Sequence, residues 1–322
     1  MTLRIYHPQI FQGNMKKKHY FEGWYYKHVT HDLKQVWSFI PGISLNDKDP
    51  HAFIQVINGI TGTSDYISYP TEQFTWDKKK LYLKIGESVF TDSYIDINIE
   101  KGDSKVTGRL SYQNMVKYPK TLLSPGIMGW YSFVPTMECK HGVVSVNHDI
   151  TGSLKVNNEH IDFNEGKGYI EKDWGTSFPE AWLWIQANNF KERDSSFHFS
   201  IAKIPWRTTY FIGFIAFLFY NKKFFLFSTY NNSVINEMNH TSDSITVKMK
   251  NRNATLKVST NKNTFGELRA PVSGQMSRRI KESIDSDVSI SLFDSDNTLL
   301  YTDSSKRAGL EVIDEIFNYV RQ

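Results

Sequence analysis

Short strand-like segments separated by turn residues recur along most of the 322-residue chain. In "SYIDINIEK", Ile95, Ile97 and Ile99 alternate with polar residues, and "KVTGRLSYQ" follows after the turn "KGDS". Because successive side chains of a strand point to opposite faces, this alternation predicts half-buried strands. Three further strand pairs follow the same pattern: "WLWIQANNF" with "FHFSIAKI", "YFIGFIAFLFY" with "KFFLFSTY", and "SITVKMK" with "ATLKVST". The spacing predicts an all-β fold of antiparallel barrels or sandwiches.

Helical patterns are few. The strongest is "AGLEVIDEIFNYVRQ", in which Leu310, Ile313, Ile316, Phe317 and Val320 fall on one face at helical spacing. This predicts a C-terminal helix over 309–322. "SRRIKESID" fits either a short helix or a strand, and "TLLSPGIM" is predicted to be a loop. We expect less than about a fifth of the residues in helix, against about a third in globular proteins.

The length is comfortable for two domains. The polar stretch "VNNEHIDFNEGKG" is the best candidate for a boundary, and both halves have a similar β texture. The prediction is an N-terminal β-domain over residues 1–165 and a C-terminal β-domain with the terminal helix over residues 166–322.

Charge and composition exclude several classes of protein. The net charge of +4 is too weak to indicate nucleic acid as a partner. The lysine runs 16–18 and 78–80 are interpreted as solvated loops, or as a weak contact with an anionic surface. A single cysteine rules out an intramolecular disulfide, and the ten histidines show no zinc-binding spacing, so no metal site is predicted. With no signal peptide and no apolar run of the about 20 residues that a membrane helix needs, we expect a cytoplasmic chain.

Two segments place charged residues among large aromatic ones. The first is "YFEGWYYK", residues 20–27. As a strand, it puts Glu22, Trp24 and Tyr26 on one face, and Gly23 leaves space beside the indole for another backbone or a ligand.

The second segment is "GYIEKDWG", residues 168–175, followed by "WLWIQANNF". As a strand, it puts Tyr169, Glu171 and Asp173 on one face, with Lys172 and Trp174 on the other. Acidic residues therefore occur beside aromatic ones in two places far apart in the sequence.

These charges have two interpretations. One is a structural ion-pair network that holds two sheets or domains together. The other is a carboxylic acid in an apolar pocket, where burial raises its pKa so that it can protonate an alkene while aromatic faces stabilise the cation.

Several segments together resemble the tocopherol cyclase family: "YFEGWYYK", "GWYSFVPTMECKHGVVSVNHDITGSL", "GYIEKDWGTSFPEAWLWIQANNF" and the late "GELRAPVSGQMSRRI". The resemblance runs from about Tyr20 to about Glu311. It implies two lipocalin-like β-domains, similar to carotenoid hydratases and lipocalin-like cyclases, with an apolar cavity near their interface. Plant members close a chromanol ring by protonating a prenyl double bond, with no metal or redox cofactor. The Asn- and Lys-rich composition suggests a bacterial source.

From the residues and the resemblance together, we expect acid-catalysed cyclisation or hydration of a prenylated phenol or polyene, without a cofactor. The alternatives are a non-catalytic carrier of a hydrophobic small molecule and a scaffold. The candidate catalytic residues are Glu171, Asp173, Glu22 and Lys172. The candidate substrate-binding residues, expected to line the pocket, are Trp24, Tyr25, Trp174, Trp182 and Trp184. The expected location is cytoplasmic, with a weak peripheral membrane contact.

Overall fold

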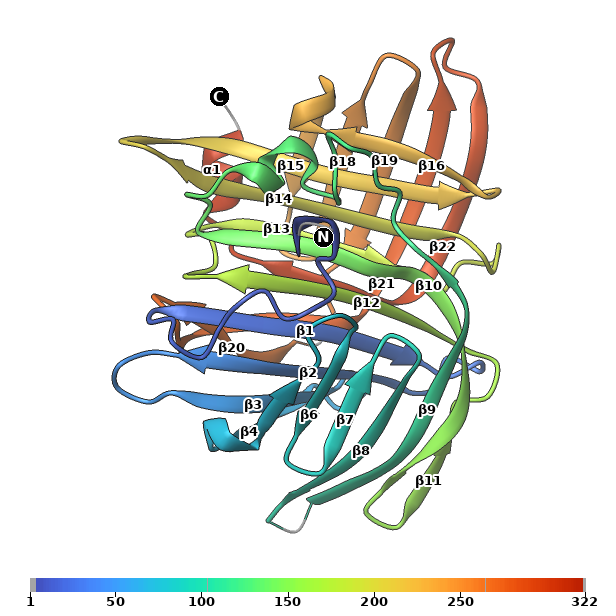
Figure 1. Cartoon of the computed structure of the whole chain (residues 1–322). Coiled ribbons are helices and arrows are strands. Elements are labelled where there is room, and N and C mark those ends of the chain that lie inside the picture. Colours follow the sequence, from blue (N-terminus) through green and yellow to red (C-terminus); the bar gives the residue numbers. More distant parts are fainter. Residues whose placement is uncertain (1–3, 103, 264, 321–322) are drawn as a thin grey trace. The chain divides into compact units, whose positions relative to one another are not determined.

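The computed structural model describes residues 4–102, 104–263 and 265–320 (Figure 1). The chain forms two compact units: residues 1–178 with 268–279, and residues 179–267 with 280–322. The division therefore does not follow a single cut in the sequence. Residues 166–175, with which the expected second domain begins, form a strand of the first unit's sheet.

Within the described residues, the first sheet has 12 strands in the order β4-β3-β2-β1-β12-β10-β9-β8-β7-β6-β5, with β11 paired to β10. All of its pairings are antiparallel. Its strands are β1 (Tyr20–Val29), β2 (Val36–Leu45), β3 (His51–Asn58), β4 (Thr63–Tyr69), β5 (Phe74–Trp76), β6 (Tyr82–Ile85), β7 (Ser88–Thr91), β8 (Tyr94–Lys101), β9 (Ser104–Val116), β10 (Cys139–Val156), β11 (Glu159–Asp162) and β12 (Gly166–Gly175). Short 3-10 turns lie at η1 (Arg4–Tyr6), η2 (Thr71–Gln73) and η3 (Gly129–Phe133).

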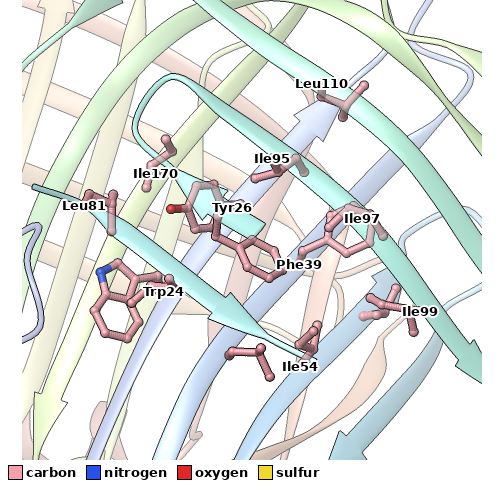
Figure 2. Close-up of a cluster of buried hydrophobic side chains, with 14 of the residues drawn as sticks. Trp24, Tyr26, Phe39, Ile54, Leu81, Ile95, Ile97, Ile99, Leu110 and Ile170 are labelled. Atoms are coloured by element: carbon pink, nitrogen blue, oxygen red, sulfur yellow. The ribbon is translucent and has the colours of Figure 1, made fainter. Parts of the chain in front are cut away.

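The core of the first unit is made by the inward-facing side chains of this sheet. Tyr26 and Phe39 are fully buried together with Ile54, Ile97 and Leu110, and Figure 2 shows these side chains gathered in one cluster. They come from β1, β2, β3, β8 and β9, so strands far apart in the sheet order share a single core. The alternation of isoleucines in β8 produces this arrangement, because each points inward between polar neighbours.

The second sheet has ten strands within the described residues, in the order β16-β15-β14-β13-β22-β21-β19-β18-β17, with β20 paired to β21. Its strands are β13 (Trp182–Ala187), β14 (Ser196–Trp206), β15 (Thr209–Tyr220), β16 (Lys223–Ser228), β17 (Val234–His240), β18 (Ser244–Lys250), β19 (Ala254–Asn261), β20 (Gly266–Val272), β21 (Gln275–Asp294) and β22 (Leu299–Val312). The turn η4 spans Thr229–Asn231, and the helix α1 spans Ile316–Val320.

The segment 268–279 belongs to the first unit through its backbone. The side chain of Gln55 bonds both the N–H and the C=O of Arg269, and Ser44 Oγ donates to the carbonyl of Gly274 at 2.6 Å. These bonds explain why the chain returns to the first unit late in the sequence.

The all-β prediction is confirmed, since 63% of the residues are in strands and 6% are helical. The three predicted hairpins are β13–β14, β15–β16 and β18–β19. "SRRIKESID" is part of the long strand β21 rather than a helix.

The predicted C-terminal helix is present, but it is much shorter than 309–322, because α1 covers only Ile316–Val320. Residues 321–322 lie outside the described residues. Residues 309–312 complete β22, where Leu310 pairs with Ile185 and Val312 with Leu183. Sheet hydrogen bonds therefore override the helical periodicity of this segment.

Candidate functional site

Strand β12 lies between β1 and β10 and carries the three consecutive charges. Alternation sends Lys172 to the inner face of the sheet, where it lies opposite Trp24 of β1. It sends Glu171 to the outer face, opposite Tyr25. The predicted catalytic residues thus form two separate clusters on opposite faces of one strand.

The inner-face cluster is an ion pair between Glu22 and Lys172, whose side chains are both fully buried. The carboxylate of Glu22 also accepts a hydrogen bond from the hydroxyl of Tyr20 and from the backbone N–H groups of Gln12, at 2.7 Å, and Gly13, at 3.0 Å. Every one of these partners is a donor, which fits an ionised carboxylate.

The ammonium of Lys172 binds the same N-terminal segment from its other side. Its Nζ donates to the carbonyls of Pro8, at 2.7 Å, and Ile10, at 2.5 Å. Trp24 Nε1 adds a 2.8 Å bond to the carbonyl of Gln9. Residues 8–13 lie outside the strands, so these side chains satisfy backbone groups that a neighbouring strand would otherwise pair.

Two indole rings enclose the ammonium of Lys172. Its Nζ lies 4.7 Å from the ring centroids of both Trp24 and Trp174, within range of cation–π attraction. Burial lowers the pKa of Lys172 to about 8, against the opposing effect of Glu22. The pair is therefore costly to place in the interior and depends on its partners.

The outer-face cluster links Tyr169, Glu171, His141 and Asp173. The hydroxyl of Tyr169 donates to Glu171 Oε2 at 2.6 Å. The imidazole of His141 lies between the two carboxylates, with Nδ1 2.9 Å from Asp173 Oδ1 and Nε2 3.5 Å from Glu171 Oε2. Glu171 is buried, whereas the side chain of Asp173 is 24% exposed.

This arrangement puts three ionisable groups, Asp173, His141 and Glu171, next to one another. When Nδ1 of His141 carries the proton and donates to Asp173, Nε2 faces Glu171. Burial, together with the charge of Glu171, raises the pKa of Tyr169 well above its usual value, which keeps that phenol protonated as a donor. A carboxylic acid held by a phenol and an imidazole suits general acid–base chemistry.

The other predicted pocket residues are distributed between the units. Trp174 lies on the inner face of the first sheet, and Tyr25 is buried on the outer face. Trp182 and Trp184 are buried in β13 of the second unit, where Trp182 Nε1 donates to Glu311 Oε2 at 2.7 Å.

A cavity of about 100 Å³ is lined by residues from β10, β12, the N-terminal segment and the loop before β10. Trp174 and His141 border it, together with Pro8, Gln12, Met128 and other residues of the N-terminal segment and the 125–132 region.

Sequence reasoning missed His141, although it lies in the "ECKHGVV" stretch that opens β10. The residue contributes because β10 pairs with β12 and puts it directly opposite Asp173, a register that one sequence does not reveal. It also missed residues 8–13, because they carry no strand or helix pattern.

The chain belongs to the tocopherol cyclase-like family, whose model matches residues 96–313. Two curated relatives align over 110 residues, which is 33% of this chain and 23% of each relative. They are a probable chloroplastic tocopherol cyclase of Oryza sativa subsp. japonica, 27% identical, and the chloroplastic tocopherol cyclase of Zea mays, 28% identical. This chain thus aligns with less than a quarter of each curated relative's length.

Solved structures of similar fold cover nearly the whole chain. CghA matches with a TM-score of 0.57 at 9% identity, and the alignment covers 91% of this chain and 88% of the CghA chain. A putative AttH of Nitrosomonas europaea matches at 0.52 and 12% identity, covering 90% and 92%. Kievitone hydratase of Nectria haematococca matches at 0.50 and 10% identity, covering 94% and 93%. At these identities the matches define the fold alone.

Among the residues that the structure describes, no helix has the length and apolar character needed to cross a membrane.

Proposed function

We propose that this protein catalyses cofactor-independent, acid-catalysed cyclisation or hydration of a lipophilic prenylated or polyene substrate at the outer-face cluster. The observation that carries the proposal is the buried carboxyl of Glu171, held by Tyr169 and adjacent to the His141–Asp173 pair. Membership of the tocopherol cyclase-like family supports a prenylated substrate, and the kievitone hydratase neighbour, by its name, catalyses a hydration on the same fold.

In the proposed step, the protonated carboxyl of Glu171 delivers its proton to one carbon of a substrate double bond. The cation formed on the neighbouring carbon is captured by the oxygen of the substrate's own phenol, which closes a ring, or by the oxygen of a water molecule. The oxygen then loses a proton, and His141 returns it to Glu171. Cyclisation is therefore an isomerisation, whereas hydration adds one water.

The remaining predicted residues take different roles in this proposal. Asp173 orients His141 through Nδ1, and Tyr25, opposite Glu171 on the outer face, is proposed to contact the substrate. Trp174, Trp182 and Trp184 stay predictions as substrate-binding residues. Glu22, Lys172 and Trp24 are proposed to position the N-terminal segment rather than to meet the substrate, because their polar groups bind that segment.

The test compares Glu171→Gln with wild type on a prenylated phenol and on a polyene, with products measured by mass spectrometry. Glutamine is nearly isosteric with the neutral acid, so we expect the melting temperature to stay close to that of wild type. Turnover should fall by about 10²–10⁴-fold, the usual contribution of a general acid. Asp173→Asn should lower turnover less.

A loss of stability without a selective loss of activity in Glu171→Gln would make the outer-face cluster structural. Binding of such substrates by wild type without any conversion would instead support the alternative, a carrier of hydrophobic molecules.

A further inference from the structure

A loop between β9 and β10 exposes four large apolar side chains. Leu122 and Leu123 are 83% and 80% exposed, and Trp130 and Phe133 are 47% and 44% exposed. Soluble proteins rarely leave such groups together in water, and where they do the site usually contacts another surface. We call residues 117–137 the 117–137 loop.

The two leucines lie at the tip of a tight turn. The backbones of Thr121 and Ser124 bond each other in both directions, at 2.8 and 3.2 Å, so that Leu122 and Leu123 are the two residues between them. This geometry presents both side chains to solvent on a defined support.

The base of the loop is fixed to the N-terminal segment through Tyr6. Its hydroxyl donates to the carbonyl of Leu122 at 2.6 Å, and its ring meets that of Phe133 edge-on at 6.3 Å. Lys120 Nζ donates to the carbonyl of Tyr6 at 2.9 Å. Trp130 stacks on Tyr131 with their ring centroids 4.1 Å apart. Tyr6 therefore connects the turn that carries the two leucines with Phe133.

Exposed cations accompany these apolar side chains. Lys117 and Lys120 are both exposed, and the one acidic residue between β9 and β10 is Glu138, exposed at the end of the loop next to β10. Arg4 lies two residues from Tyr6, the residue that contacts the loop. Leucines at the tip, aromatic residues in the same loop and exposed cations beside them match the layers of an anionic bilayer: acyl chains, interface and phosphate headgroups.

A second exposed leucine pair provides an internal comparison. Leu299 and Leu300 are 51% and 46% exposed, but they lie between Asp296 and Asp303 in the chain. An anionic surface would repel that pair, so it serves as a matched control with the same side chains.

We propose that the 117–137 loop docks this protein on an anionic lipid bilayer, with Leu122 and Leu123 inserted among the acyl chains and Trp130 and Phe133 at the interface. The same loop region contributes Pro125, Met128 and Ser132 to the cavity that also borders His141. Docking would therefore bring a lipid phase close to the residues of the first unit's candidate site. The docking itself is independent of the proposed chemistry.

The test is flotation of the full chain with vesicles of phosphatidylcholine plus phosphatidylglycerol, and with vesicles of phosphatidylcholine alone. Wild type should float with the anionic vesicles, and added salt should weaken the binding because it screens the lysines. The double variant L122S/L123S should partition at least about tenfold more weakly, because two leucines no longer enter the apolar layer. The control L299S/L300S should bind like wild type.

Trp130 gives a local readout. Vesicles with brominated acyl chains should quench part of the tryptophan emission, and Trp130→Phe should remove most of that quenching. Equal flotation of L122S/L123S and wild type, or no flotation of wild type, would overturn the proposal. So would self-association that L122S/L123S abolishes without vesicles, since the patch would then bind a second copy. Activity of L122S/L123S on detergent-dispersed substrate should equal that of wild type, so failure of the proposed chemistry and failure of docking are distinguishable.

Discussion

Strand β12 carries two clusters of charge, one on each face, and their environments differ. On the inner face, Glu22 is surrounded only by donors: Lys172, the hydroxyl of Tyr20 and two backbone N–H groups. On the outer face, Glu171 meets a phenol and an imidazole, and that imidazole also contacts Asp173. The first environment offers a carboxylate donors alone, whereas the second places two carboxyl groups beside one imidazole.

Under the proposed function, neighbouring residues of this one strand have different roles, one structural and one catalytic. Lys172 holds residues 8–13 against the inner face, and Glu171, one residue earlier, faces the opposite side. Removing a charge should therefore have different consequences on the two faces. It should lower the stability of the protein on the inner face, and under the proposed function it should lower the activity on the outer face.

The largest expected effect on stability is that of Glu22→Gln. It leaves the ammonium of Lys172 buried without its anionic partner, and breaking a buried pair costs about 3–5 kcal/mol. Urea unfolding should show a lower midpoint with an unchanged slope. The double variant Glu22→Gln/Lys172→Met should recover part of the loss, because no charge is then left in the interior. A Glu22→Gln protein as stable as wild type would remove the structural role assigned to the inner face.

Much of this division could be predicted from the sequence. Alternation alone puts Glu22 and Trp24 on one face of their strand, and separates Glu171 from Lys172 on the other strand. The partners could not be predicted, because they depend on the register between β1, β12 and β10. His141 meets Asp173 only through that register.

The dependence on pairing between distant strands also explains the errors in the predicted fold. The helical pattern near residue 310 reflects real apolar spacing, but the segment pairs with two strands distant in the sequence. Leu310 pairs with Ile185 of β13, more than a hundred positions away, and with Ser283 of β21, some thirty positions away. The strands themselves were predictable, because each follows from local alternation and turn residues. Residues 8–13 have no pattern of their own, and their conformation is imposed by the side chains of Glu22, Trp24 and Lys172.

The next effect is a loss of stability in mild acid, caused by a third group of buried residues. His28 bonds the hydroxyl of Tyr112 at 2.7 Å, and His148 bonds Ser145 Oγ at 2.9 Å. Burial lowers the pKa of His28 to about 3 and that of His148 well below its usual value. The unfolded chain therefore binds more protons below pH about 6.5, so stability is present above that pH and falls as the pH drops toward 3.

At pH about 5.5, the two histidines together should cost about 3 kcal/mol relative to pH about 7.5, since one pH unit below the unfolded pKa costs about 1.4 kcal/mol per group. Urea unfolding across this range measures the slope. His148→Gln should roughly halve it, because only His28 then remains to be protonated on unfolding. An identical slope in wild type and His148→Gln would contradict this assignment.

A smaller effect is expected for Tyr169→Phe, which tests the outer face directly. The change removes one hydrogen bond to Glu171 and should cost about 1–2 kcal/mol of stability. Under the proposed function, turnover should also fall, because the carboxyl loses the donor that orients it. Tyr26→Phe is the matched control: its hydroxyl, on the inner face, donates to the carbonyl of Thr91 at 3.1 Å. It should cost a similar amount of stability without a change in turnover.

The smallest effect should come from an ion pair at the surface, which sets the scale for the buried one. Lys101 Nζ lies 2.7 Å from Asp65 Oδ1, and both side chains are nearly half exposed. Water and salt screen such a pair, and ordering two flexible side chains offsets much of the attraction, so Lys101→Met should change the free energy of unfolding by less than about 1 kcal/mol. Added salt should reduce even that difference, but it should leave the effect of Glu22→Gln nearly unchanged, because the buried pair is not screened. If Lys101→Met costs as much as Glu22→Gln, burial is not what makes the inner-face pair important, and the contrast between the two faces of β12 loses its physical basis.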